Sequence, residues 1–511
     1  MKIDQLPSWV NSLPPWLAKI TEGVFFKIPS VKKQIDGEVD KMLLGLEPGM
    51  KPYKGKTKEY TTLPDQGVAP DEIMKMMKDF AEHEKAKWKD GYVSGGVYHG
   101  DEKHIQFLNE VYALHSQSNP LHSDLFPSVV KFENEIIEMV AGFLSANNAE
   151  KTRDQRICGM LTSGGTESIL VAMKAYRDRA AEEQGIHYPE MITSVTAHAA
   201  FEKAAHYFGI KHIKIPITGN YEMDLKATER AVNRNTIVIV GSAPHFPHGM
   251  IDPIEKLAEI ARKNNVALHV DACLGGFILP FASELSKTEF PQVKVPAFDF
   301  SIPEVTSLSI DTHKYGFAAK GSSVILYRGE NLRRYQYFTT TDWPGGLYFS
   351  PTLTGSRPGA LVATAWAAML KTGRSGYLDS TRKILTAAKK IVDGIKTIPE
   401  LQIIGDPVHV VAFTSNSLDI YRVLDEMSTR GWSLNGLHKP PAVHIALTLR
   451  HAQEGVAERF VADLKASVEK TKGSKPADGG LAPVYGLAGS IPFRGLVGNL
   501  LKKYLDVLYR P

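Results

Sequence analysis

Short apolar runs of β-strand length alternate with helical patterns through the middle of the chain, from residue 157 onward. Helical periodicity separates most of these runs, as at 199–208 and 254–264. Strands and helices that alternate over about 170 residues predict an α/β fold, with a mostly parallel central sheet and helices on both faces. The predicted strands are ICGML (157–161), MITSV (191–195), IKIPI (213–217), TIVIVGSA (236–243), VALHVDA (266–272), the run with Leu308 and Ile310, and SSVILY (322–327).

An N-terminal arm and a smaller domain are predicted on either side of this region. The expected divisions are an arm over 1–60, a large domain over 61–370 and a small α+β domain over 371–511. The arm has apolar residues at helical spacing, but Pro14 and Pro15 interrupt the pattern, so two short helical pieces are expected. We expect them to pack on the body or on a partner subunit in preference to a membrane, because their polar face is not strongly basic.

The rest of the chain is less regular, and its expected elements follow from local patterns alone. In chain order they are an exposed connector (51–70), loops (91–127), a helix from Ser128, and, after residue 375, a long helix, two or three short strands within LQIIG, HVVAF and AVHIALTL, a helix at 450–470, a polar stretch at 473–485 and a last helix at 493–508.

The bulk composition excludes several classes of protein. With 511 residues, 43% of them hydrophobic and 23% charged, the chain can bury a large core and form two or three domains. A net charge of +4 is small for this length and gives no field for nucleic acid. Cys158 and Cys273 form neither a disulfide framework nor a metal-ligand pattern, which suits a reducing cytoplasm. We expect no transmembrane segment and no signal peptide, because no apolar run of the required length occurs.

Four features fall where predicted strands end, which is the edge of a parallel sheet where ligands bind. The first is Ser163-Gly164-Gly165-Thr166, between a strand and a helix. Its glycines let the backbone approach a ligand closely, and a helix N-terminus offers free N–H groups to a phosphate. A Gly-Gly pair before a helix is more often only a tight turn, so this motif gains weight from the other three.

Asp271 and His198 are the second and third features. Asp271 ends VALHVDA, and a carboxylate there can keep a pyridine nitrogen protonated. At an effective dielectric near 20 and roughly 4 Å, such a pair interacts by about 4 kcal/mol, or about three pKa units. His198 follows the strand at 191–195, where its imidazole can stack on a planar ring. Taken singly, Asp271 is more simply a cap of the next segment and His198 a helix-start histidine without a ligand.

The fourth feature is the pair His313-Lys314. The run SLSID (307–311) alternates polar and apolar residues and predicts a strand that ends near Thr312. A lysine just past a strand end, between turn residues, is suited to a Schiff base with pyridoxal phosphate. A solvated loop lysine is the ordinary alternative for any lone lysine, and only the combination with the other three features favours chemistry at Lys314.

The ordered set of a glycine-rich turn, a stacking histidine, a strand-end aspartate and a strand-end lysine resembles the pyridoxal-phosphate-dependent (group II) decarboxylase-like family of fold type I. Within that family the chain is most similar to members that cleave phosphorylated sphingoid bases. The resemblance rests on VSGGVYHGDEK (93–103), SNPLHSDLFPSVVKFE (118–133), LTSGGTESILVA (161–172), GSAPHFPHGMIDP (241–253), HVDACLGGF (269–277), SIDTHKYGFAAKG (309–321), GSRPGALVATAW (355–366) and PPAVHIALTLRHA (440–452).

The resemblance implies a carbon–carbon lyase with pyridoxal 5'-phosphate as its cofactor. It implies retro-aldol cleavage of a long-chain base phosphate into a fatty aldehyde and phosphoethanolamine, a reaction of sphingolipid degradation. The residues implied to hold the cofactor are Lys314, Asp271, His198, Gly164, Gly165, Thr166, His313 and Ser356, the last reaching a phosphate from the neighbouring subunit of a homodimer with a shared active site.

The resemblance also implies Tyr98, His122 and Lys320 as substrate-phosphate ligands or proton carriers. The base that takes the proton of the C3 hydroxyl stays open between Lys314 and His122. Compared with the eukaryotic members, we expect no N-terminal transmembrane anchor and a closer likeness to the bacterial members, with at most a peripheral membrane contact.

Two other functions remain open at this stage. An amino-acid decarboxylase of the same fold would use the same lysine, aspartate and histidine, and it would need an arginine to bind the substrate carboxylate. Arg357 is the nearby candidate for that role. A lipid-surface scaffold that has lost catalysis is disfavoured, because every expected cofactor residue is present.

Overall fold

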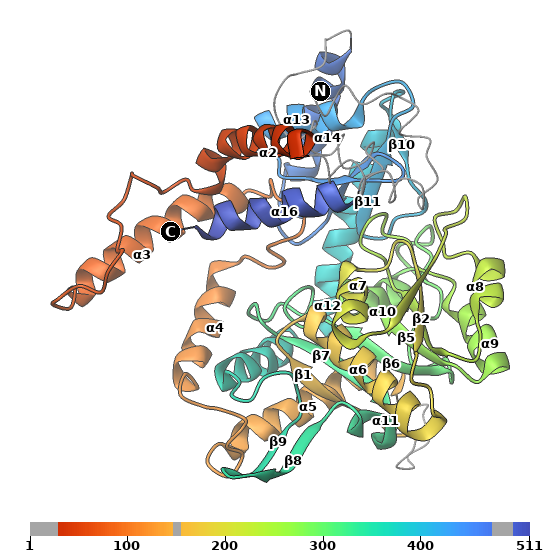
Figure 1. Cartoon of the computed structure of the whole chain (residues 1–511). Coiled ribbons are helices and arrows are strands. Elements are labelled where there is room, and N and C mark those ends of the chain that lie inside the picture. The colour runs from red at the N-terminus through yellow and green to blue at the C-terminus, as the bar shows by residue number, and fades with distance from the viewer. Residues whose placement is uncertain (1–28, 147–154, 473–493, 511) are drawn as a thin grey trace.

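The computed structural model describes residues 29–146, 155–472 and 494–510. At its centre lies a seven-stranded sheet in the order β1-β7-β6-β5-β4-β2-β3 (Figure 1). Strand β7 runs antiparallel to both neighbours, and the other pairs are parallel, so the predicted mostly parallel sheet is confirmed. The strands are β1 (Ile157–Thr162), β2 (Glu190–Ser194), β3 (Lys211–Ile215), β4 (Thr236–Ser242), β5 (Ala267–Asp271), β6 (Val305–Ile310) and β7 (Ser323–Arg328).

Helices cover both faces of this sheet. Successive residues of one strand accordingly pack into two different apolar clusters. Met191 packs in the cluster that holds residues of α6 (Gly165–Gln184) and α7 (Ala199–Phe208). The next residue, Ile192, packs in the cluster that holds residues of α5 (Pro127–Phe143), α9 (Ile254–Asn264) and α10 (Leu279–Leu285). Side chains alternate across a strand, so a sheet buried on both faces needs apolar residues at consecutive positions. This requirement explains the unbroken apolar runs of the sequence.

The C-terminal part carries a second, four-stranded antiparallel sheet in the order β10-β11-β13-β12. Its strand β12 is absent from the sequence prediction. The boundary predicted at 370 falls inside α12, three residues before Gly373, where helical geometry is interrupted (φ 58°, ψ 173°). The division into domains therefore stays a prediction. The elements are α12 (Gly359–Lys396), β10 (Gln402–Ile403), β11 (Val410–Thr414), α13 (Ile420–Thr429), β12 (Asn435–Leu437), β13 (Ala442–Ala446) and α14 (Val456–Thr471).

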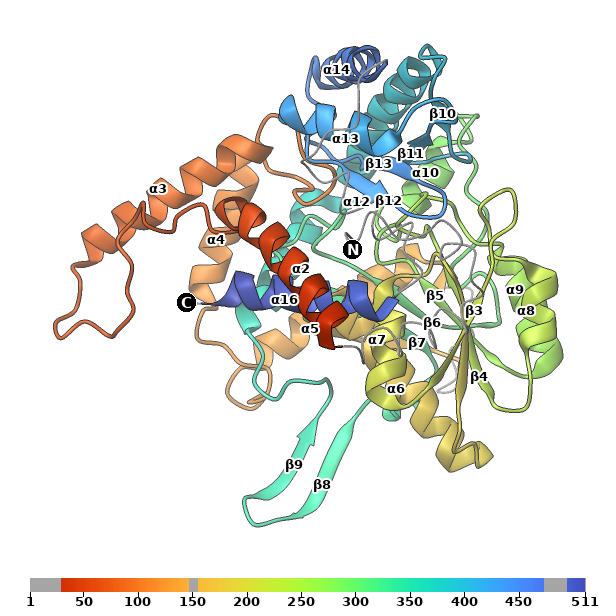
Figure 2. The same ribbon diagram turned by 45° about the horizontal axis from the view of Figure 1, so that its top comes forward.

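Several peripheral elements extend away from the two sheets. Helix α2 (Pro29–Met50) lies beside α16 (Arg494–Tyr509), and α3 (Pro70–Trp88) projects to one side (Figure 1). The α2–α16 contact includes Lys503 Nζ, which lies 3.0 Å from Asp36 Oδ1. A hairpin of β8 (Phe338–Trp343) and β9 (Gly346–Ser350), which the sequence patterns did not indicate, projects from the large sheet's domain (Figure 2).

The prediction of loops over 91–127 is wrong for α4 (Glu102–Leu114). Asp101 caps this helix by accepting a hydrogen bond from the backbone N–H of His104, and a cap of this kind is a helix-start signal. The neighbouring glycines and histidines obscured it. Two other expected features, the helical pieces of the first 28 residues and the polar stretch at 473–485, lie outside the described residues.

The short helices α8 (Leu225–Ala231) and α11 (Glu330–Arg334) complete the described elements of the large domain. Within the described ranges, no helix combines the length and apolar character that crossing a membrane requires.

Candidate active site

Four loops meet at one edge of the large sheet, because β1, β2, β5 and β6 all run in the same direction. The turn at Ser163 follows β1, His198 follows β2, Asp271 ends β5, and Asp311 follows β6. The edge where the carboxyl ends of parallel strands meet is the usual ligand site of such sheets. The predicted convergence of the four sequence features is therefore present in the fold.

The side chain of Lys314 is joined to Asp311 by an ion pair, with Nζ 2.8 Å from Oδ2. Burial opposes the charged form of Lys314, but attraction to Asp311, helped by Cys273 and Tyr98, outweighs it and raises the lysine pKa above its ordinary value. Burial likewise opposes ionisation of Asp311, and Lys314 and His313 nevertheless hold the pKa of that carboxyl below its usual value. The two groups therefore form a charged, buried pair.

Three hydrogen bonds from distant elements fix the turn that follows Lys314. Tyr315 Oη donates to the carbonyl of Leu447, at 2.7 Å, just beyond the end of β13. Tyr377 of α12 donates to the carbonyl of Gly316, at 2.9 Å. His104 Nε2 of α4 lies 2.7 Å from the carbonyl oxygen of Phe317, a residue with a positive φ of 60°. Holding a bulky residue in that conformation needs such surrounding contacts. The position of Lys314 is therefore determined by the body of the protein.

Two hydrogen bonds within the chain orient the carboxylate of Asp271. Its Oδ1 accepts hydrogen bonds from Ser309 Oγ, at 3.2 Å, and from the backbone N–H of Cys273, at 3.1 Å. Among the residues that the structure describes, both donors bind Oδ1, which leaves Oδ2 for a donor from outside the chain. A protonated pyridine nitrogen is such a donor, so the arrangement fits the ring of pyridoxal phosphate.

The glycine turn lies against the same cluster. A Cβ atom at Gly165 would be 2.8 Å from both Asp311 Oδ1 and Cys273 Sγ, so only glycine fits there. A Cβ at Gly164 would lie 3.7 Å from His313 Cε1, which places His313 beside the turn. Asp311 Oδ1 itself is buried and has no hydrogen-bond partner among the described residues. The close-packed start of α6 fits a ligand at the N-terminus of this helix, and the unsatisfied oxygen of Asp311 can accept only from a hydrogen-bond donor.

Tyr98 and Lys320 lie together, and each is close enough to Lys314 to interact with its charge. The loop that carries Tyr98 is bound to the segment after β13 of the four-stranded sheet, since the backbone N–H of Leu449 donates to the Tyr98 carbonyl at 3.1 Å. Lys320 Nζ is 4.5 Å from the centre of the Tyr98 ring. Burial raises the pKa of Tyr98, so its hydroxyl stays protonated, whereas partial burial and repulsion from Lys314 lower the pKa of Lys320 to about 8. The pair offers a hydroxyl donor and a cation to an anion.

Three predicted residues are placed near this edge without a direct contact to Lys314 in the described structure. His198 caps α7, its Nδ1 accepting from the backbone N–H of Ala200 at 3.1 Å, so its ring orientation is fixed. His122 lies in an exposed turn closed by a bond from its N–H to the Asn119 carbonyl, at 3.0 Å. Ser356 accepts from the side chain of Asn119, also at 3.0 Å. Ser356 and the turn of His122 therefore share Asn119 as a contact.

The sequence reasoning missed two acidic residues of this site. Asp311 stands in SIDTHK, and its position three residues before Lys314 on a tight turn was the signal that it would reach the amine. Glu167 binds two backbone N–H groups, of Ser163 at 2.7 Å and of Leu353 at 3.0 Å. Glu167 thereby joins the loop before Ser356 to the glycine turn of the same chain, and no local pattern indicates such a contact.

Comparison with known proteins gives a consistent result. The family model described as the pyridoxal-dependent decarboxylase conserved domain matches residues 61–415. The sphingosine-1-phosphate lyase of Arabidopsis thaliana is 45% identical over 492 residues, which are 95% of this chain and 88% of the relative. Sphingosine-1-phosphate lyase 1 of Mus musculus is 41% identical over 486 residues, 94% of this chain and 83% of the relative.

Solved structures agree with the sequence comparison. The sphingosine-1-phosphate lyase of Burkholderia pseudomallei superimposes with a TM-score of 0.82 at 40% identity, covering 90% of this chain and all (100%) of that one. The glutamate decarboxylase of Lactobacillus brevis has a TM-score of 0.68 at 20% identity, covering 84% of this chain and 99% of that one. The second likeness shows that the fold is shared with the decarboxylases.

The ion pair gives a prediction about the reactivity of Lys314. An amine reacts only when neutral, and its neutral fraction falls tenfold for each unit by which its pKa exceeds the pH. Asp311→Asn removes the attraction that raises the pKa and leaves burial, which lowers it. Acetic anhydride should therefore label Lys314 of the cofactor-free Asp311→Asn chain at least about tenfold faster at pH 8 than wild type.

Labelling is read by mass spectrometry of a digest, with exposed lysines such as Lys131 as the internal reference. Asp311→Glu keeps the negative charge and is the matched control, which should label like wild type. Equal labelling of Lys314 in all three proteins would show that Asp311 does not control the amine.

Proposed function

The chain belongs to the pyridoxal-dependent decarboxylase family and, within it, to the sphingosine-1-phosphate lyases, and we propose that the cluster around Lys314 performs the cleavage. The chain is a pyridoxal-phosphate-dependent lyase that splits sphingosine 1-phosphate into a long-chain aldehyde and phosphoethanolamine. The observation that carries the residue assignment is the convergence of Lys314, Asp311, Asp271 and the Gly165 turn on one sheet edge.

The residues at this edge fit the parts of pyridoxal phosphate one by one. When bound, this group supplies an aldehyde that condenses with amines and a ring that accepts the electron pair of the breaking bond. Lys314 would provide the amine that holds it, and Asp271 would face the ring nitrogen. The N–H groups at Gly164, Gly165 and Thr166 would bind its phosphate, and His198 would lie against the ring face.

Lys314 is the better supported of the two candidates for the base at the C3 hydroxyl. Cleavage between C2 and C3 removes the hydroxyl proton, and a proton must later be added at C2. Asp311, 2.8 Å from Lys314 Nζ, stabilises the ammonium form and so makes the free amine a stronger base. His122 lies in an exposed turn and has no described contact with this cluster. We therefore assign the proton transfers to Lys314 and a supporting role to Asp311.

The substrate phosphate is assigned to Tyr98 and Lys320, and His122, which has no described contact with them, is kept as a third ligand on the family resemblance alone. A hydroxyl donor beside a cation suits a phosphate dianion. The rival decarboxylase function needs a free arginine for a carboxylate, and Arg357 is not free. Its guanidinium forms two bonds with Glu133, at 3.1 and 3.0 Å, and a third with the carbonyl of Leu161. This occupied arginine supports cleavage of a phosphorylated substrate over decarboxylation.

Product analysis tests the function directly. Incubation of the purified chain with a sphingoid-base phosphate should yield a fatty aldehyde and phosphoethanolamine in equal amounts, measured by mass spectrometry. Lys314→Ala and Lys314→Arg should both abolish turnover, because neither side chain can hold the cofactor. Lys314→Arg keeps a cation beside Asp311, so it separates loss of chemistry from loss of the ion pair. Release of carbon dioxide from an amino acid, without aldehyde, would support the decarboxylase instead.

The phosphate assignment predicts a pH dependence. Lys320, with a pKa of about 8, loses its charge above that pH, so kcat/KM for the phosphorylated substrate should fall on the alkaline side. Lys320→Arg should remove this decline, because an arginine stays charged. Lys320→Ala should lower kcat/KM roughly ten- to hundredfold, since a charge-assisted hydrogen bond contributes about 1.5–3 kcal/mol.

The matched comparison uses the same sphingoid base with and without its phosphate. Wild type should strongly prefer the phosphorylated form, and Lys320→Ala should lose most of that preference. A variant that discriminates as well as wild type would place the phosphate site elsewhere.

We further propose that the protein works as a homodimer with active sites shared between subunits. The projecting β8–β9 hairpin and the loop after it expose large apolar side chains, which a second copy would cover. The exposed residues are Phe338, Trp343, Leu347, Phe349 and Leu353. Ser356 follows this segment directly, so a subunit contact there would bring it to a neighbouring site.

Mixing two inactive variants tests the shared site. Lys314→Ala chains retain Ser356, and Ser356→Asp chains retain Lys314. A hybrid dimer should regain one intact site and a substantial part of the activity if Ser356 acts across the interface. If Ser356 serves the site of its own chain instead, every site of the hybrid carries one defect, and no activity returns.

We also propose that the protein is cytoplasmic and makes a peripheral contact with the membranes that hold its substrate. Cys158 and Cys273 are both free and buried, which suits a reducing compartment.

A further inference from the structure

A continuous row of buried polar side chains leads away from Asp271 through the interior of the large domain. Ser309 Oγ lies 3.2 Å from Asp271 Oδ1 and 3.3 Å from His269 Nε2. On its other side, His269 Nδ1 lies 2.6 Å from Ser307 Oγ. Ser307 Oγ in turn lies 2.5 Å from the hydroxyl of Tyr176. None of the four side chains of this row, Ser309, His269, Ser307 and Tyr176, is more than 2% exposed.

The row follows from the register of two neighbouring strands. His269 and Asp271 are two residues apart on β5, and Ser307 and Ser309 are two residues apart on β6. The parallel pairing places His269 opposite Ser307 and Asp271 opposite Ser309. Because side chains alternate along a strand, all four lie on the same face of the sheet. Tyr176 reaches that face from α6.

The direction of each hydrogen bond is fixed by elimination. Ser309 donates to the carboxylate of Asp271, so its contact with His269 needs an N–H on Nε2. Burial lowers the pKa of His269 to about 4, so the ring is neutral and Nδ1 is then an acceptor. Ser307 therefore donates to Nδ1, and the Tyr176 hydroxyl donates to Ser307. Every proton in the row points toward Asp271.

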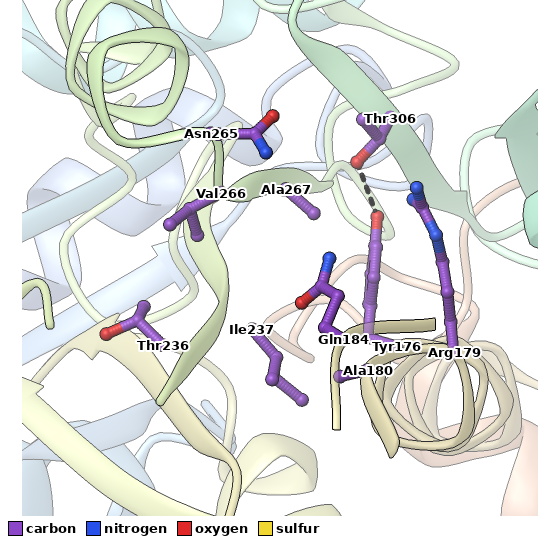
Figure 3. Close-up of a pocket in the computed structure, with 10 residues that line it drawn as sticks. All are labelled: Tyr176, Arg179, Ala180, Gln184, Thr236, Ile237, Asn265, Val266, Ala267 and Thr306. Carbon is purple, nitrogen blue, oxygen red and sulfur yellow. Dashed lines mark hydrogen bonds between the residues drawn. The ribbon is translucent and has the colours of Figure 1, made fainter. Parts of the chain in front are cut away.

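The far end of the row lies at the opposite edge of the sheet. Tyr176 also contacts Thr306 Oγ1, at 2.7 Å, where both residues line a pocket of about 230 Å³ (Figure 3). Arg179 and Gln184 of α6 and Asn265 from the start of the β5 region line the same pocket. The hydroxyl of Tyr176 is thus remote from the catalytic edge, so its removal does not touch the cofactor.

We propose that His269 is a positioning residue of Asp271, and that the row Tyr176–Ser307–His269–Ser309 orients this carboxylate toward the ring nitrogen of the cofactor. Charge-assisted hydrogen bonds are stronger and more directional than neutral ones. A row of aligned donors strengthens each of its members. The proposal rests on the assignment of Asp271 to the ring nitrogen, and the experiment separates the two.

The test compares two cofactors on the cofactor-free, full-length chain. One is pyridoxal phosphate, and the other is its analogue with CH in place of the ring nitrogen. Dissociation constants come from fluorescence titration. His269→Leu and Ser309→Ala should weaken pyridoxal phosphate about tenfold and change the affinity for the analogue less than about twofold. Tyr176→Phe, which acts through two intermediates, should show a smaller effect of the same kind, about threefold.

Tyr327→Phe is the matched control for Tyr176→Phe. Tyr327 is also fully buried, and its hydroxyl donates a hydrogen bond to Gln336 Oε1 at 2.8 Å, but it is not part of the row. The affinity of Tyr327→Phe for both cofactors should equal that of wild type. If His269→Leu does not fold, Ser309→Ala and Tyr176→Phe carry the test, because each removes only a hydroxyl group.

Asp271→Asn completes the set. If Asp271→Asn weakens pyridoxal phosphate more than the analogue and the row variants do not, the positioning role of His269 is wrong while the assignment of Asp271 stands. If Asp271→Asn changes the affinity for both cofactors equally, Asp271 does not face the ring nitrogen, and the assignment itself is wrong. Equal weakening of both cofactors by His269→Leu and Ser309→Ala would show a packing role alone and would overturn the proposal.

Discussion

The parallel pairing of β5 with β6 is the constraint on which the rest of the site depends. This register aligns two pairs of polar residues on one face, His269 with Ser307 and Asp271 with Ser309. A slip of one residue would turn Val270 and Leu308 to that face and would point the polar side chains into the opposite apolar cluster. Both strands are buried on both sides, so such a slip leaves polar groups unsatisfied. The apolar packing of the sheet thus also fixes the geometry of its polar edge.

The end of β6 places a second requirement on the fold. Asp311 is buried and charged, and a buried carboxylate is tolerated only with a close partner. Lys314 is that partner at 2.8 Å, and His313 Nε2 lies 3.7 Å from the same oxygen. Burial lowers the pKa of His313, so Lys314 supplies the positive charge that Asp311 needs. The turn is held from three sides by Tyr315, Tyr377 and His104, so the partners of Asp311 cannot drift apart as the charge changes.

The sequence predicted the α/β class, the seven strands and the edge at which they end, because each of these follows from apolar periodicity. Lys314, Asp271 and the Gly165 turn were predicted for the same reason, since each is adjacent to a strand end. Asp311 was missed because its role depends on the shape of a turn. The row behind Asp271 depends on the pairing of β5 with β6, and 33 residues separate these two strands in the sequence. No local pattern contains that information.

The same dependence on distant contacts explains how one fold can serve two reactions. The chain shares its architecture with the glutamate decarboxylase of Lactobacillus brevis at only 20% identity, so the sheet and its edge do not select the substrate. Selection falls to groups that come from other elements. Arg357, which follows the projecting hairpin, is bound to Glu133 of α5 and to the end of β1, and it therefore serves as a structural link. Lys320 and Tyr98 come from two loops, and Tyr315 and Leu449 attach these loops to the region after β13 of the four-stranded sheet. These contacts with the region after β13 therefore help to hold Tyr98 and Lys320 in place beside Lys314.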